Sequence, residues 1–264
     1  MQWEQLTSPD FARMAEETRV CVVSMGVLEK HGEHLPLGTD FLNGHKIACL
    51  ATERESAVVF PYFYFGQIFE ARCFPGTIAI NPKLLIELIE EVFDEIARNG
   101  FNKIIVYNWH GGNWNLLKFI NQCALWERKK YNVYLYMENV VDDVMQVVCT
   151  PMGHACEWET SVTLSHAPEL VRMDKIPEEP SLPLNKLKDM PFTNCCVNWY
   201  SLYPEHYAGD ARLASIEKGK LLLDIHVNAL ASYIASVKSD QIVSKLTDEF
   251  YSRVKEVGYT DSDK

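Results

Sequence analysis

Short apolar runs and longer stretches with helical spacing alternate along the chain. RVCVVSMG at 19–26 is a short apolar, β-branched run that ends at a glycine, the pattern of a buried strand whose two faces are both covered. Residues 40–55 have helical spacing, with Asp40 placed as the N-cap. AVVFPYFYFG at 57–66 predicts the next strand.

The same order continues in the middle of the chain. Residues 81–100 predict the clearest helix, with a proline at its first position and a glycine as its stop. A strand at 103–113 runs into a glycine turn, and a helix at 113–130 and a strand at 132–141 follow. Strands that alternate with helices in this way predict parallel βαβ units.

The last third of the chain is predicted to be mostly helical. A loop after residue 149 enters a helix, and residues 174–208 are irregular and rich in proline. Residues 213–239 predict a long amphipathic helix, which a weaker, charged helix follows. No linker-like segment divides the chain, so we expect one α/β domain over 1–264.

Composition and charge restrict the function. Hydrophobic residues make up 47% of the chain, enough for a packed core. The net charge of −11 and the scattered basic residues predict no nucleic-acid partner. The N-terminus lacks the features of a signal peptide and no apolar run reaches about 18 residues, so we expect a cytoplasmic protein without a membrane partner. The eight cysteines form no CxxC pair, and we expect them to be reduced.

Potential metal ligands follow two of the predicted strands. Glu29, His31, His34 and Asp40 come after the first strand, and His110 comes after the third. Ligands in open α/β sheets bind beyond the carboxyl ends of strands, and imidazole and carboxylate groups suit divalent transition metals. The zinc-protease pattern HExxH does not apply, because a glycine and a proline interrupt any helix here.

A third cluster, GHACEWETS at 153–161, contains His154, Glu157 and Glu159. On a strand the two glutamates would share a face, whereas on a helix they lie about 200° apart and only one can point into a given site. A nucleophilic Cys156 is disfavoured, because the adjacent carboxylates would raise the pKa of its thiol.

Several neighbouring residues have structural interpretations. His34 is a candidate for holding a metal ligand by a hydrogen bond, and Glu33 is expected to be solvated. Aromatic residues beside the clusters could line a pocket or pack in the core; they are Trp109, Trp114 and Trp158. The remaining histidines stand in ordinary contexts and are interpreted as structural; they are His45, His166, His206 and His226.

These clusters together resemble the creatininase (creatinine amidohydrolase) family of metal-dependent hydrolases. The matching segments are EKHGEHLPLGTD at 29–40, FPGT at 74–77, HGGN at 110–113 and HACEWETS at 154–161, with a weaker match, AGDARLASIEKG, at 208–219. They occur in the family's order and cover nearly the whole chain.

The resemblance implies a three-layer αβα sandwich with a mostly parallel central sheet and two divalent metal ions per chain, of Zn, Mn or Fe. One ion would be held by Glu29, Asp40 and His110. The other would be held by His31, Asp40 and Glu157, so that Asp40 bridges the two. His154 would carry the nucleophile's proton to the leaving nitrogen, and Glu159 would orient a neighbouring group.

Three departures from the family pattern argue against creatinine itself as the substrate. Creatinine-cleaving members carry Tyr-Glu where this chain has Gly111 and Gly112, Cys156 replaces a small residue, and Arg72 stands where a histidine is common. Glu70 and Arg72 precede the FPGT motif and are open to either a substrate contact or a structural role.

We therefore expect a hydrolase that cleaves a non-peptide C–N bond in a small cyclic amide or formamide. The alternatives are a hydrolase of a keto-cyclitol ring, of the dehydro-inosose type, and a catalytically silent metal-binding protein. Family members are commonly hexamers, so a homo-oligomer is expected. The apolar stripe of 213–237 suits either an interface between subunits or a face packed on the sheet.

Overall fold

A sheet of four parallel strands lies at the centre of the computed structural model, which describes residues 1–137 and 139–257. The strands are β1 (Val20–Met25), β2 (Val58–Val59), β3 (Lys103–Asn108) and β4 (Asn132–Leu135), in the spatial order β2-β1-β3-β4. The parallel βαβ units predicted from the sequence are therefore confirmed.

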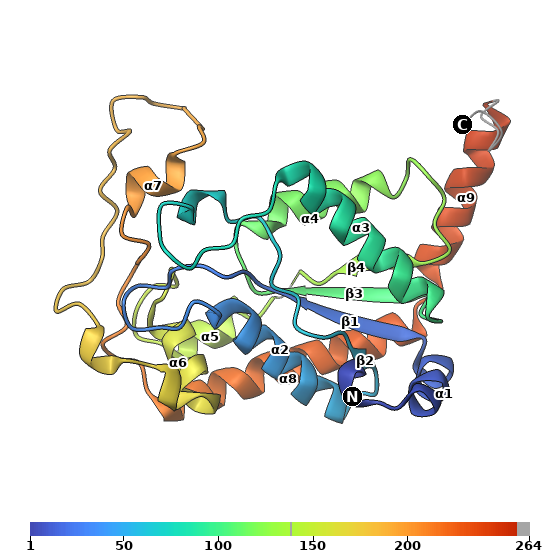
Figure 1. The fold of residues 1–264 in the computed structure, drawn as a ribbon, viewed down its shortest axis with the longest axis horizontal. Coiled ribbons are helices and arrows are strands. Elements are labelled where there is room, and N and C mark those ends of the chain that lie inside the picture. Colours follow the sequence, from blue (N-terminus) through green and yellow to red (C-terminus); the bar gives the residue numbers. More distant parts are fainter. Residues whose placement is uncertain (138, 258–264) are drawn as a thin grey trace.

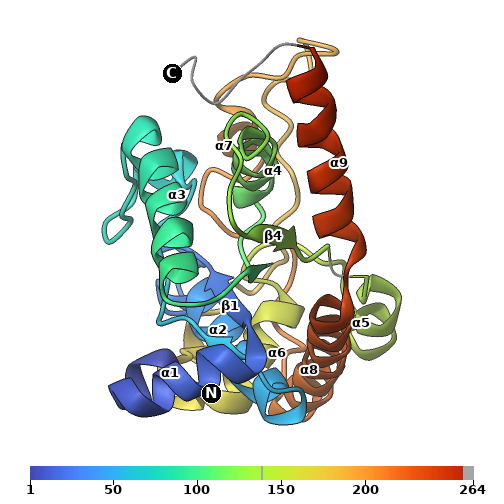
Figure 2. The same cartoon turned by 90° about the vertical axis from the view of Figure 1, so that its right-hand side faces the viewer.

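Helices cover both faces of this sheet (Figures 1 and 2). One layer contains α2 (Thr39–Arg54), α5 (Val141–Val147), α6 (Glu157–His166) and α8 (Ile216–Ser239). The other contains α1 (Ser8–Thr18), α3 (Pro82–Arg98) and α4 (Asn113–Cys123). The remaining helices are α7 (Asn198–Leu202), α9 (Ile242–Glu256) and the short 3-10 turns Trp3–Gln5, Phe69–Ala71, Pro168–Leu170 and Met173–Lys175. This is the predicted three-layer αβα arrangement.

The apolar side chains of β1 contribute to two hydrophobic clusters, one on each face of the sheet. Val20 and Val22 pack with Leu230 of α8 in one hydrophobic cluster. Cys21 and Val23 point the other way and pack in a second cluster, among residues of α3 and α4. Since successive side chains of a strand alternate between faces, a strand covered on both sides is expected to be apolar at nearly every position.

The register between β1 and β3 determines where the site lies. Val20 pairs with Lys103, and Met25 pairs with Asn108. The two strands therefore end at the same level, and the segments that follow them emerge side by side at the carboxyl edge of the sheet.

Some element boundaries differ from the sequence expectation. The strand predicted at 57–66 is paired only at Val58–Val59, because Pro61 has no N–H to donate to the ladder. Beyond it, Phe63 forms an isolated bridge. The helix predicted at 113–130 ends at Cys123, and the strand predicted at 132–141 ends at Leu135. Position 138 of that prediction, and 258–264 of the predicted domain, lie outside the described residues.

All eight cysteines are free thiols in this structure. Within 1–137 and 139–257, no helix is both long enough and apolar enough to traverse a bilayer.

Candidate metal centre

Four of the predicted ligands meet at the carboxyl edge of the sheet, and all four are buried. His110 Nδ1 lies 2.8 Å from Glu29 Oε1 and 3.1 Å from Asp40 Oδ2. His31 Nε2 lies 3.0 Å from Asp40 Oδ1. Asp40 therefore stands between the two histidines, as expected of a bridging carboxylate.

The local backbone explains how these side chains converge. The loop after β1 closes on itself, since the N–H of Glu29 donates to the carbonyl of Leu37. Gly32 has a φ of +60°, a left-handed conformation that favours glycine. A side chain at Gly26 would approach to 2.6 Å from the Cβ of Asp40, so the glycine lets the start of α2 pack against the end of β1.

The outer nitrogen of each ligand histidine faces a backbone carbonyl. His110 Nε2 is 2.8 Å from the carbonyl oxygen of Gln67, and His31 Nδ1 is 3.3 Å from that of Glu29. Because a carbonyl can only accept, a neutral ring carries its proton there and presents a lone pair inward. Histidines that bind metals usually have such a partner.

The inward lone pairs face carboxylate oxygens, which is unfavourable unless a cation lies between them. Within the described part of the chain, the buried oxygens Glu29 Oε1 and Asp40 Oδ2 make no hydrogen bond of acceptable geometry, although His110 Nδ1 lies close to both. Two imidazoles and buried carboxylates form a donor set suited to divalent transition metals. The residues present thus fit a metal centre.

The pKa shifts show the same demand for positive charge. Burial lowers the pKa of His31, but the carboxylates of Asp40 and Glu29 outweigh it and raise this pKa to about 10. Burial also lowers the pKa of His110, but the carboxylates of Glu29 and Asp40 outweigh this effect and raise the pKa well above its ordinary value. The cluster therefore stabilises cations at both inner nitrogens, which protons or metal ions can supply.

The structure does not bring Glu157 to this cluster. Its Oε2 accepts hydrogen bonds of 2.9 Å from the backbone N–H groups of Cys149 and Thr150, and its Oε1 pairs with Lys218. In this structure Glu157 therefore joins α6 to the preceding loop and to Lys218, and its expected role as a metal ligand stays a prediction. The physical reason that Glu157 lies away from the cluster is that α6 begins at this residue, so residues 157 and 159 point in different directions.

Glu159 takes the position expected of Glu157. Its carboxylate forms a group with His31 and His154 in which one ligand atom from each lies within 4.8 Å of the others. Burial raises the pKa of Glu159 to about 7. This geometry makes Glu159 a candidate for a ligand position as well, while the role of orienting a neighbouring group expected from the sequence stays a prediction.

His154 stands beside the cluster as a neutral base. Its ring centroid lies 4.2 Å from that of His31, and its Nε2 is 2.8 Å from the carbonyl oxygen of Lys30. Burial and the neighbouring His31 lower the pKa of His154 to about 4. With the Nε2 proton directed at a carbonyl, the Nδ1 lone pair is the one left to accept a proton.

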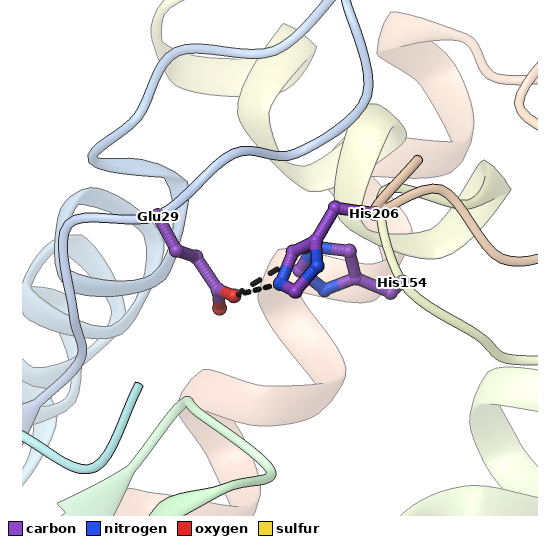
Figure 3. A group of neighbouring side chains, drawn as sticks. All are labelled: Glu29, His154 and His206. Carbon is purple, nitrogen blue, oxygen red and sulfur yellow. Dashed lines mark hydrogen bonds and ion pairs between the residues drawn. The ribbon is translucent and has the colours of Figure 1, made fainter. Parts of the chain in front are cut away.

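His206 was missed by the sequence analysis, which interpreted it as structural. Its Nε2 lies 3.0 Å from Glu29 Oε2, and Figure 3 shows that it reaches this carboxylate together with His154. His206 is buried and belongs to the irregular segment 174–208, which carries no periodicity to place it. Its position two residues before the AGDARLASIEKG match was the one available signal.

Other predicted neighbours lie around the cluster. His34 Nε2 is 2.9 Å from the hydroxyl of Thr160 on α6, so it contacts the helix that carries Glu159. Cys156 is buried, and burial raises the pKa of its thiol to about 11, which argues against a nucleophilic role. Glu33 is exposed and pairs with Lys30.

A cavity of 580 Å³ opens onto the cluster. Trp109, Trp114, Trp158 and Glu70 line it, as do Trp199 and Tyr203 from segment 174–208. Arg72 is not among the described residues that line it. A cavity with an aromatic wall and a few buried polar groups is typical of a site for a small organic molecule.

The fold and this site define an α/β metalloprotein with a substrate-sized cavity. A family model described as "Creatininase: Creatinine amidohydrolase" matches residues 4–234. The chain belongs to the creatininase family and is a hydrolase, so the resemblance seen in the sequence is confirmed.

Curated relatives within the family differ in what their names say they act on. The chain is 26% identical to a creatinine amidohydrolase of Pseudomonas putida, covering 84% of this chain and 91% of that one. It is 25% identical to a 3-dehydro-scyllo-inosose hydrolase of Thermotoga maritima, covering 90% and 82%. It is 30% identical to a mycofactocin precursor peptide peptidase of Mycolicibacterium smegmatis, covering 63% and 65%.

Solved creatininase structures share the fold. The structure titled "E122Q mutant creatininase, Zn-Zn type" superimposes with a TM-score of 0.77 at 24% identity, covering 90% of this chain and 98% of that one. The structure titled "Creatininase Mn" has a TM-score of 0.77 at 22% identity, covering 90% and 99%. Divalent metal ions thus occur in structures of this fold.

Proposed function

We propose that this protein is a dinuclear metal-dependent hydrolase that cleaves a non-peptide C–N bond in a small cyclic amide or formamide. The observation that carries the proposal is the buried cluster of carboxylates and imidazoles, with its inward-facing oxygens, at the base of an aromatic cavity. A neutral histidine stands beside it as a proton acceptor.

The proposed ligand set replaces Glu157 with Glu159. Glu29, Asp40 and His110 would hold one ion, and His31, Asp40 and Glu159 would hold the other. Three carboxylates against two divalent ions leave a net positive charge, which favours an anionic nucleophile. Divalent ions of Zn, Mn or Fe would polarise the substrate's carbonyl oxygen and lower the pKa of the attacking water.

The protein's own groups supply the proton transfers and the shape of the site. His154 would accept the water's proton at Nδ1 and deliver it to the leaving nitrogen, while its Nε2 hydrogen bond to Lys30 holds the ring in place. The aromatic residues Trp114 and Trp199 would exclude water and hold a flat substrate against the cluster.

Creatinine is disfavoured as the substrate by the local backbone at Gly112. A Cβ at this position would approach to 2.5 Å from both His110 Nε2 and the side chain of Gln67. The glutamate that creatinine-cleaving members carry at this position, which the family resemblance implies is a metal ligand there, therefore does not fit this backbone without rearrangement. Glu159 supplies the carboxylate instead.

Metal content of the purified protein tests the proposal directly. Elemental analysis should find close to two divalent ions per chain, and Asp40→Asn should abolish both binding and turnover because Asp40 serves both ions. A single ion per chain would instead indicate a mononuclear hydrolase. Full activity in Asp40→Asn would contradict the scheme.

The similarity to the Thermotoga maritima enzyme favours a second candidate, hydrolysis of a keto-cyclitol ring. Here the same ions would polarise a ring ketone, a water would add to its carbonyl carbon, and the adjacent ring C–C bond would break with the water's proton passing to the departing carbon. A panel of cyclic amides and formamides assayed beside dehydro-inososes separates the two candidates. Metal binding without hydrolysis of any compound would favour a silent metal-binding protein.

The proposal also includes a homo-oligomeric, cytoplasmic enzyme. Sedimentation analysis of the purified protein tests the assembly, for which the resemblance implies a hexamer. The stripe of α8 gives no independent support, because Leu222, Leu230 and Ile234 are buried against the sheet within one subunit.

A further inference from the structure

A chain of two hydrogen bonds connects the cavity wall to a metal ligand. The indole Nε1 of Trp199 lies 3.2 Å from His206 Nδ1, and His206 Nε2 lies 3.0 Å from Glu29 Oε2. All three residues line the cavity, and the two imidazoles shown in Figure 3 approach the same carboxylate.

The donors and acceptors of this chain determine which nitrogen of His206 carries the proton. An indole N–H can only donate, so His206 Nδ1 must accept. The proton is then on Nε2, where it is donated to the carboxylate of Glu29. His206 therefore has no lone pair left for a metal ion, and it acts on the centre through Glu29.

The backbone of His206 is fixed to the same loop. It has a φ of +55°, a left-handed conformation that costs energy for any residue with a Cβ. Its carbonyl accepts a hydrogen bond of 3.0 Å from the N–H of Gly32, in the ligand loop itself. Phe74, of the FPGT motif, packs beside the imidazole with ring centroids 5.4 Å apart.

We infer that His206 is a positioning residue for the metal centre: it holds Glu29 in its ligating orientation, and Trp199 holds His206 in the tautomer that does so. This inference rests on the proposed metal-dependent function. Segment 174–208 then has a second role besides forming the cavity wall. Trp199, which lines the cavity, also determines which nitrogen of His206 carries the proton.

Two amide substitutions separate the two hydrogen bonds. The amide of a glutamine reaches the position of Nε2, so His206→Gln keeps a donor for Glu29. The amide of an asparagine reaches only the position of Nδ1, so His206→Asn keeps an acceptor for Trp199 and loses the donor to Glu29. Asparagine tolerates a left-handed backbone better than glutamine does, so a purely conformational role would favour His206→Asn.

Zinc affinity of the full-length protein, measured by competition with a chromogenic chelator at neutral pH, is the readout. We expect His206→Asn to bind Zn²⁺ about 10–100-fold more weakly than the wild type, the usual effect of removing a partner of a metal ligand. His206→Gln should remain close to the wild type. Trp199→Phe, which keeps a ring but loses the N–H, should fall between them.

Trp158→Phe is the matched control for the tryptophan. Trp158 also lines the cavity and also donates its indole N–H to a histidine, His226, at 3.1 Å, but its acceptor is not bonded to Glu29 in any described contact. Its Zn²⁺ affinity should therefore equal that of the wild type. Thermal unfolding of the chelator-treated variants shows whether each one folds.

The outcomes separate this inference from the proposed function. If the wild type binds no Zn²⁺, the metal centre itself is overturned and this inference falls with it. If the wild type binds Zn²⁺ and a folded His206→Asn binds it equally well, only the positioning role is overturned. An affinity lost equally in His206→Gln and His206→Asn would also overturn it, in favour of a packing or backbone role.

Discussion

Two glutamates separated by one residue illustrate what decides a ligand set at the scale of single residues. Glu157 is the first residue of α6, and Glu159 lies about 200° further round the helix. Only Glu159 points to the histidines, while Glu157 ties the helix to the preceding loop and to α8 through Lys218. The sequence offered both glutamates, and the direction in which each points from the helix is the reason that the proposed ligand set contains Glu159.

Substituting each glutamate with glutamine distinguishes the two roles. Glu159→Gln should lose most metal binding and activity, because an amide is a poor ligand for a transition metal in this donor set. Glu157→Gln should retain the metal but lower the free energy of unfolding by about 2–3 kcal/mol, because it weakens charge-assisted hydrogen bonds. Metal content and denaturant unfolding measure the two effects.

Each variant serves as the control for the other. A Glu157→Gln protein that folds normally yet loses its metal would restore the ligand set expected from the sequence.

The pairing of helices α2 and α6 matters at the scale of elements, because α2 carries Asp40 and α6 carries Glu159. The side chain of Asn43 on α2 lies 3.1 Å from the hydroxyl of Thr163 and 2.8 Å from His166 Nε2, both on α6. These contacts are buried or partly buried, and they hold the two ligand-bearing helices in one register. His166, interpreted as structural from the sequence, has this helix-joining contact.

The pKa of His166 makes this helix contact sensitive to acid. Burial lowers that pKa to about 4, from about 6.5 in an unfolded chain. The unfolded state therefore binds more protons between these values, so the stability contributed by neutral His166 is complete above pH 6.5 and is lost as the pH falls towards 4. We expect the loss between pH 7 and 5 to be about 1 kcal/mol, after allowance for partial exposure.

His166→Gln tests this, since its amide can still donate to Asn43 but does not titrate. Urea unfolding at pH 7 and 5 should show a smaller loss of stability in the variant than in the wild type. Other buried histidines, His34 and His154, keep part of the acid sensitivity in both proteins. Equal losses in the two proteins would show that His166 does not contribute.

Periodicity predicted the elements better than it predicted their ends. The continuous apolar run of β1 and the spacing of α3 are local patterns, and both appear within two residues of the expected bounds. The strand expected at 57–66 looked as apolar as β1, but ladder pairing depends on a neighbour and on the N–H that Pro61 lacks. Local patterns of this kind carry no information about contacts between distant segments, and those contacts determine where a strand ends.

The metal centre is assembled by the whole molecule. Its proposed ligands come from the loop after β1, the start of α2, the end of β3 and the first turn of α6, and His206 adds a contact from segment 174–208. The sequence predicted that the side chains following β1 and β3 would lie together, because parallel strands bring their carboxyl ends to one edge; their role as metal ligands stays a proposal. The sequence could not predict His206, since no regular element carries that residue to Glu29.

Because its ligands are so dispersed, the centre exists only in the folded state, and metal binding should therefore stabilise the whole domain. An ion that binds only the folded protein, at a free concentration about 100 times its dissociation constant, adds about 2.7 kcal/mol. For a chain of this size that corresponds to a rise in melting temperature of roughly 5–10 °C. Calorimetry of the chelator-treated wild type, with and without added Zn²⁺, measures the shift. Asp40→Asn should melt at the same temperature in both conditions, because the carboxylate proposed to bridge both ions is gone. If the melting temperature of the wild type also does not change with Zn²⁺, the charges of the buried cluster are balanced by protons and not by metal ions.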